Sequence, residues 1–93
     1  MIVGVLSTRV FIGQSQSLKD KRRVIKSLKD RVRNKFNVSV AETGMQDNRQ
    51  NAVIGIAMVG SDRRYVNSNL SAIVNFFGLF PQMDLVDYKI EFL

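Results

Sequence analysis

The sequence contains no cysteine and no histidine, and these two absences exclude much chemistry. Without cysteine, the chain can form neither a disulfide nor a thiolate metal site. Without histidine, it lacks the commonest general base and the commonest ligand of transition metals. No stretch approaches 18 consecutive apolar residues, so we expect no membrane-spanning segment. We therefore expect a protein without metal, cofactor or catalytic residues.

The length of 93 residues predicts a single domain over residues 1–93. Such a chain buries roughly 60–65% of its unfolded surface, which is enough for a modest core. The apolar start lacks a cationic lead and a small-residue cleavage site, so it predicts a strand and not a signal peptide. The expected location is the cytoplasm.

Positive charge is concentrated in one segment. The chain has 14 basic and 8 acidic residues, and nine of the basic residues lie between Lys19 and Lys35. At 100° per residue, an apolar stripe follows one side of this segment, and six cations share an arc of about 120° on the opposite side. The stripe comprises Leu18, Ile25, Leu28, Val32 and Phe36, and the cations are Lys19, Arg22, Arg23, Lys26, Lys29 and Arg33.

Hydrophobic periodicity predicts six elements in the order βαββαβ. Strands are expected over residues 2–12, 38–43, 52–59 and 85–92. The first helix covers 18–35 with Ser17 as its N-cap, and the second lies between a Ser61 cap and a Gly78 stop. This order is typical of the α+β ferredoxin-like sandwich, in which two helices cover one face of a four-stranded antiparallel sheet.

The second face of such a sheet is left uncovered by the chain itself. We expect Val5 and Phe11 on it, with Met58 and Tyr88 as further candidates. A partly apolar open face is typical of a surface that binds a partner or a second copy. The phenylalanine-rich end of the second helix, around Phe76 and Phe80, is an alternative dimer contact.

Three short segments resemble a known family. They are SLKDKRR from Ser17 to Arg23, FNVSVAE from Phe36 to Glu42, and QD at 46–47 followed by QNAVIG from Gln50 to Gly55. On these residues the chain resembles the DUF503, or YlxP-like, family of small bacterial proteins. The resemblance implies a ferredoxin-like fold and a gene among translation and ribosome-maturation genes, near a 30S-binding factor. It implies no established activity, and Arg49 stands where family members often carry an aromatic residue.

The six cations of the first helix predict contacts with successive phosphates of structured RNA or of a ribosomal subunit. The alternative for this face is simple solvation. The polar connection 44–51 is a second candidate surface, with Asp47, Arg49 and Gln50 as partner-binding residues or as a solvated tip. Glu42 either pairs with a basic residue or faces water.

Two other activities find little support in the residues. The chain does not match the aromatic consensus by which sheets of this fold stack single-stranded bases. The loop 13–17 opens onto a helix, as in acylphosphatases, but it lacks an arginine and a base to activate Ser15 or Ser17. The leading hypothesis is a non-catalytic RNA- or ribosome-associated protein. The alternative is a self-associating scaffold or a protein-binding regulatory domain without nucleic-acid contact.

Overall fold

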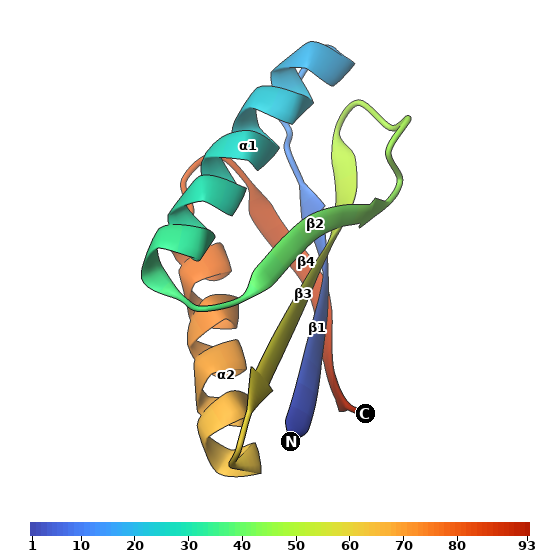
Figure 1. The fold of residues 1–93 in the computed structure, drawn as a ribbon. Coiled ribbons are helices and arrows are strands. Elements are labelled where there is room, and N and C mark those ends of the chain that lie inside the picture. The colour runs from blue at the N-terminus through green and yellow to red at the C-terminus, as the bar shows by residue number, and fades with distance from the viewer.

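The computed structural model describes residues 1–93 and has the βαββαβ order. Both helices lie on the same side of a single sheet (Figure 1). The strand order is β2-β3-β1-β4, and every neighbouring pair is antiparallel. The predicted ferredoxin-like class is therefore confirmed. The elements are β1 (Ile2–Phe11), α1 (Leu18–Lys35), β2 (Ser39–Gly44), β3 (Asn51–Gly60), α2 (Arg63–Leu79) and β4 (Asp84–Phe92).

Helix α1 has the predicted bounds. The Ser17 hydroxyl accepts a hydrogen bond from the Asp20 amide at 3.0 Å, which makes Ser17 the N-cap. The backbone becomes extended at Phe36, so the helix ends at Lys35. The apolar stripe turns toward the sheet, with Ile25, Leu28 and Val32 fully buried.

Helix α2 differs from the prediction at both ends. Its N-cap is Asp62 and not Ser61, because the Asp62 carboxylate is the side chain that accepts from the Tyr65 amide, at 3.3 Å. At the other end the helix continues through Gly78 to Leu79, and Phe80 adopts extended backbone before Pro81. Neither helix combines the length and the apolarity needed to cross a membrane.

The core lies between the helices and the inner face of the sheet. Leu6 and Val10 of β1, with Ile54 and Ile56 of β3, form its floor. The two glycines beside α2 let that helix approach closely. A Cβ on Gly4 would lie 2.6 Å from Val66, and one on Gly60 would lie 2.7 Å from the same residue. The helix roof consists of Ile25, Leu28, Val32, Val66, Leu70, Ile73 and Phe77.

The outer face of the sheet carries Val5 and Phe11, as predicted, because both alternate with buried residues of β1. Met58 was wrongly predicted there. It pairs with Gly4 and is only 5% exposed, on the helix side. Tyr88 was also wrongly predicted there, because it pairs with the buried Thr8 and so shares the helix-side face, at the sheet edge.

Strand β4 is less regularly buried than its alternating sequence predicts. Arg9 pairs with Asp87 while Val10 pairs with Leu85, so Val86 is the extra residue of a bulge. Val86 is consequently 54% exposed, and Tyr88 on the same edge strand is 51% exposed. Ile90 and Phe92 lie on the helix-side face, where they pack partly buried against the core.

Candidate nucleic-acid interface

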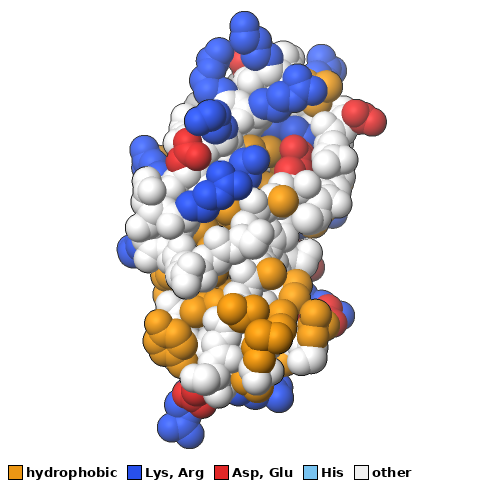
Figure 2. Space-filling model, in the orientation of Figure 1, with side chains coloured by type: hydrophobic (Ala, Val, Ile, Leu, Met, Phe, Trp, Pro, Cys, Tyr) orange, Lys and Arg blue, Asp and Glu red, His pale blue; other side chains and the backbone are white.

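The six predicted cations lie together, but on the flank of α1 that faces β2 and not on the side opposite the apolar stripe, because four of them line a groove with Glu42 of β2. We call Lys19, Arg22, Arg23, Lys26, Lys29 and Arg33 the cationic strip. Lys29 is partly exposed, and the other five are exposed. At 1.5 Å per residue, the strip extends over about 21 Å. Figure 2 shows Lys and Arg side chains gathered over the end of the molecule where α1 lies, with hydrophobic side chains toward the opposite end.

One carboxylate interrupts the cationic strip. Lys26 Nζ lies 3.0 Å from Asp30 Oδ2, and Arg33 Nη1 lies 3.9 Å from Asp30 Oδ1. The hydrogen bond from Lys26 holds the pKa of Asp30 below its usual value of 3.8, and the surrounding positive charges act in the same direction. The remaining members, Lys19, Arg22, Arg23 and Lys29, form no ion pair within the chain.

A shallow groove runs between the cationic strip and strand β2. Its volume is about 470 Å³. Arg33 spans one end, because its Nη2 donates to the Val40 carbonyl of β2 at 3.2 Å. The groove is lined by Arg22, Ile25, Lys26, Lys29, Asp30, Arg33 and Glu42. It therefore joins four cations of the strip to two carboxylates, in a site open to solvent.

Beneath this groove lies a buried lysine that the sequence pattern did not single out. Lys21 is 0% exposed, and its Nζ lies 2.9 Å from Glu42 Oε2. The same Nζ donates to the main-chain carbonyls of Met45, Gln46 and Asn51 at 2.9, 3.4 and 3.1 Å. Because an ammonium group has only three hydrogens, the four acceptors around Lys21 Nζ cannot each receive one, and the Glu42 carboxylate also supplies the counter-charge.

The connection between β2 and β3 is held in place by further hydrogen bonds. Asn48 Oδ1 accepts from the amides of Gln50 and Asn51, at 3.0 and 2.8 Å. Gln50, one of the predicted partner-binding residues, donates through Nε2 to the Gly13 carbonyl at 3.1 Å. The other two, Asp47 and Arg49, are exposed and make no ion pair within the chain. Of the three predicted residues, the Gln50 side chain is therefore hydrogen-bonded within the chain, whereas Asp47 and Arg49 are exposed.

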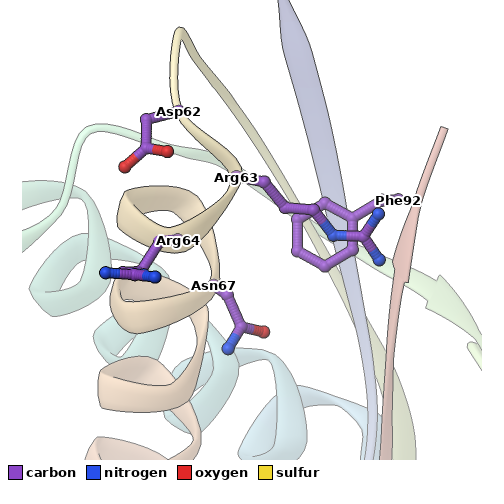
Figure 3. A pocket seen from close by; sticks show the side chains of 5 residues that line it. All are labelled: Asp62, Arg63, Arg64, Asn67 and Phe92. Carbon is purple, nitrogen blue, oxygen red and sulfur yellow. The ribbon is translucent and has the colours of Figure 1, made fainter.

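A second concavity, of about 580 Å³, lies at the N-terminal end of α2. Figure 3 shows that its side chains do not converge on a common point. Arg63 lies over the ring of Phe92, 4.3 Å from its centroid, while Arg64 points away on the other side of the helix. Asp62 is occupied as the N-cap. Of the two arginines in this concavity, only Arg63 packs against another side chain of the concavity.

The remaining basic residues of α1 pack against aromatic rings. Arg31 lies 5.3 Å from the ring centre of Phe80, and Lys35 lies 5.5 Å from that of Phe76. Phe80 itself is buried, and Phe76 is partly buried. The chain thus covers these two phenylalanines, whereas Leu79 at the same helix end is 83% exposed. No three His, Cys, Asp or Glu side chains are grouped so as to hold a metal ion.

Lys21 and Glu42 are the site residues that sequence reasoning underused. At 100° per residue, Lys21 falls between Leu28 and Val32, inside the apolar stripe, and that position was the available signal. A lysine within such a stripe needs a buried acceptor. Glu42, for which pairing and solvation were both considered, is that partner.

The comparison with solved structures agrees with this fold. A likeness to the de novo designed protein Foldit4 has a TM-score of 0.54 at 17% identity, covers 100% of this chain and 97% of that one, and bears on the fold alone. The sequence is 39% identical over 83 residues to "Uncharacterized protein YlxP" of Bacillus subtilis (strain 168), covering 89% of this chain and 90% of that protein. Residues 3–90 match the family described as "Protein of unknown function (DUF503)". The chain therefore belongs to the DUF503 family.

Proposed function

We propose that this protein is a non-catalytic, cytoplasmic RNA-binding protein, associated with structured RNA or a ribosomal subunit, that contacts the phosphate backbone through α1. The observation that carries the proposal is the cationic strip, in which six basic side chains lie along one helix face. Asp30 is the one carboxylate that pairs with members of the strip, namely Lys26 and Arg33. Neutralising phosphates with such side chains releases counterions and supplies affinity without sequence choice.

The composition of the strip favours a polyanion over an acidic protein. Protein interfaces draw most of their energy from a few buried aromatic, aliphatic or arginine anchors. No large hydrophobic residue is exposed on α1. The exposed ones all lie elsewhere, at Met1, Met45, Val59, Tyr65, Leu79, Val86, Tyr88 and Leu93. A face of charges without apolar anchors suits phosphates better than a protein surface.

The open sheet face supports contact with folded RNA and not with stacked single-stranded bases. Sheets that read single strands place aromatic rings on their central strands. Here the central positions of β1 and β3 on that face carry Ser7 and Arg9 opposite Gly55 and Val53. Phe11 lies at the end of β1, and Tyr88 belongs to the other face. Recognition by shape and phosphate is the mode that remains.

A salt series of filter-binding measurements with a stem-loop RNA tests this function. The test variant changes Lys19, Arg22 and Lys29 to glutamine, since none of the three forms an ion pair within the chain. The control changes Arg9, Arg64 and Lys89 to glutamine, which removes the same charge elsewhere. The magnitude of the slope of log K against log salt should fall by up to about 2.7 in the test variant, at up to about 0.9 for each of the three lost phosphate contacts.

The control triple should keep nearly the whole slope of the natural sequence. If both triple variants lost the same amount of slope, overall charge and not the strip would explain the binding. If the natural sequence bound no RNA, the proposed function would be wrong. Co-sedimentation with ribosomal subunits, measured on the same three proteins, then tells whether the RNA contact is made on a ribosome.

A second candidate function is self-association through the open sheet face. Both edge strands are poor sites for pairing. Arg33 and Gln46 side chains donate to the Val40 and Glu42 carbonyls of β2, and β4 has a bulge. The open face instead presents exposed Ala57 beside Val5. Light scattering of the natural protein should show a dimer, and Ala57→Arg should dissociate it. The control Ala72→Arg, on the exposed side of α2, should leave the dimer intact. A monomeric natural protein would eliminate this candidate.

A further inference from the structure

Two connections that are far apart in sequence lie together at the N-terminal end of α1. The Ile12 amide donates to the Gln50 carbonyl at 2.6 Å, and Gln50 Nε2 returns a bond to the Gly13 carbonyl. Figure 1 shows the β2–β3 connection beside the first turns of α1. The 45–50 connection therefore lies at the end of α1 at which the cationic strip begins.

The Lys21 side chain fixes this connection to α1 through hydrogen bonds to main-chain carbonyls. Burying an ammonium group costs several kcal/mol unless partners compensate for lost water. Here the compensation comes from Met45, Gln46 and Asn51, all of which belong to the connection or to its junction with β3, and from Glu42. A buried charge thus fixes the position of this segment. A hairpin tip that only faced water would not need one.

The side chains that the pinned connection presents are chemically different from the strip. The carbonyl of Gln46 is held 3.4 Å from Lys21 Nζ, and the next residue is the exposed carboxylate Asp47. Asp47 forms no ion pair within the chain, and it belongs to the connection that Lys21 joins to α1, the helix that carries the cationic strip. A carboxylate repels phosphate, but it is a strong acceptor for a hydroxyl donor.

We propose that the 45–50 connection contacts the ribose of RNA bound to the cationic strip, with Asp47 accepting a hydrogen bond from a 2′-hydroxyl and Lys21 acting as the positioning residue. This inference rests on the proposed function. The strip supplies affinity that RNA and DNA share, because both carry phosphates. The connection supplies the preference for RNA, because the 2′-hydroxyl is the group that DNA lacks.

The test compares one stem-loop sequence made as RNA and as DNA, with the affinity ratio as the readout. Removal of a carboxylate near phosphate should, by charge alone, strengthen binding to both. The inference instead requires that Asp47→Ala lower the RNA-to-DNA ratio by about five- to tenfold, because one charge-assisted hydrogen bond is lost. Asp47→Asn keeps a carbonyl acceptor and should retain most of the ratio. Asp84→Ala, at an exposed carboxylate on the opposite edge strand, should leave it unchanged.

Lys21 is tested with Lys21→Met combined with Glu42→Gln, which removes both buried charges together. The RNA-to-DNA ratio should fall as in Asp47→Ala while the salt slope stays near that of the natural sequence, because the strip is intact. Adding Asp47→Ala in this background should change the ratio no further, and a merely structural role for Lys21 would not produce that coupling.

The outcomes separate this inference from the proposed function. If neither nucleic acid binds, the proposed function fails. If RNA binds through the strip but Asp47→Ala leaves the ratio unchanged or strengthens both complexes equally, only the inference is overturned. Should the double variant at Lys21 and Glu42 not fold, the comparison of Asp47→Ala with Asp47→Asn still decides the matter.

Discussion

The two helices cover the same sheet face but are attached to the rest of the chain by different physics. Helix α2 has a buried stripe that is wholly apolar, comprising Val66, Leu70, Ile73 and Phe77, and it approaches the sheet at two glycines. Helix α1 places Lys21 within its buried stripe and neutralises it with Glu42 and three carbonyls. One helix is held by shape, and the other is held partly by a buried charge.

The two helices also differ in the charge that they carry, and α1 is again the charged one. Nine of the 18 residues of α1 are basic and two are acidic, whereas α2 has two arginines and no acidic residue. Four of the ten exposed positions of α2 are uncharged polar residues, namely Asn67, Ser68, Ser71 and Asn75. The chain therefore concentrates its positive charge on α1, which holds nine of the 14 basic residues. A solubilising role alone would not require that concentration, since charge on either helix would serve.

The largest effect should come from breaking the buried charge that distinguishes α1. Lys21→Met leaves Glu42 without its counter-charge and removes the donor from three carbonyls, so unfolding free energy should drop by about 3–5 kcal/mol. Urea unfolding followed by circular dichroism measures the change. Lys19→Met, two residues earlier and exposed, should stay within about 0.5 kcal/mol of the natural sequence. A comparably small loss for Lys21→Met would mean that α1 is held as α2 is.

Smaller changes in the free energy of unfolding should follow from two glycine substitutions, one beside α2 and one within it. One substitution should destabilise the protein and the other should stabilise it. A methyl group added by Gly4→Ala would meet Val66 and Leu70 at 2.6 and 2.8 Å, so overpacking should cost about 1–3 kcal/mol. Gly78→Ala meets nothing within 4 Å and should stabilise α2 by about 0.5–1 kcal/mol. Thermal unfolding of both variants checks the pair. If Gly4→Ala were neutral, the helix would not sit as close to the sheet as the glycines indicate.

Most of the fold could be predicted from the sequence because the relevant signals are local. Helical spacing and the Ser17 cap gave the bounds of α1, and the alternation in β1 assigned Val5 and Phe11 to the outer face. The errors in strand burial occurred where a neighbouring element decides the outcome, whereas those at the ends of α2 concern the choice between adjacent residues. The bulge opposite Arg9 and Val10 exposes Val86, and it depends on how two distant strands pair.

The candidate site was predictable only in part, for a related reason. The cationic strip follows from the spacing of charges along one helix, so all six members could be named. The partners of Lys21 could not be named, because three of the four are main-chain carbonyls, which every residue has, in a segment 24 to 30 residues away. Residue type identifies side-chain chemistry, whereas only the folded path of the chain identifies a carbonyl ligand.

The smallest effect should come from Asp30, the carboxylate within the cationic strip. Asp30→Asn frees Lys26 and Arg33 for phosphate, so the salt slope of RNA binding should increase by up to about 0.9 for each additional phosphate that these side chains neutralise. Asp84→Asn, which makes the same charge change outside the strip, should leave the slope unchanged. If the two variants behaved alike, net charge and not the arrangement on α1 would set the affinity, and the contrast between the helices would lose its functional meaning.

The same residue makes a pH-dependent contribution whose sign is defined. The hydrogen bond from Lys26 lowers the pKa of Asp30 in the folded protein below 3.8, so the ionised form is favoured by folding. Its stabilisation is present above pH 3.8 and is lost as the pH falls through the lower folded value. Because Asp30 is exposed, the effect is small. Thermal melts at about pH 7 and near pH 3 should show slightly less acid destabilisation in Asp30→Asn than in the natural sequence, and an identical or larger drop would contradict a stabilising pair within the strip.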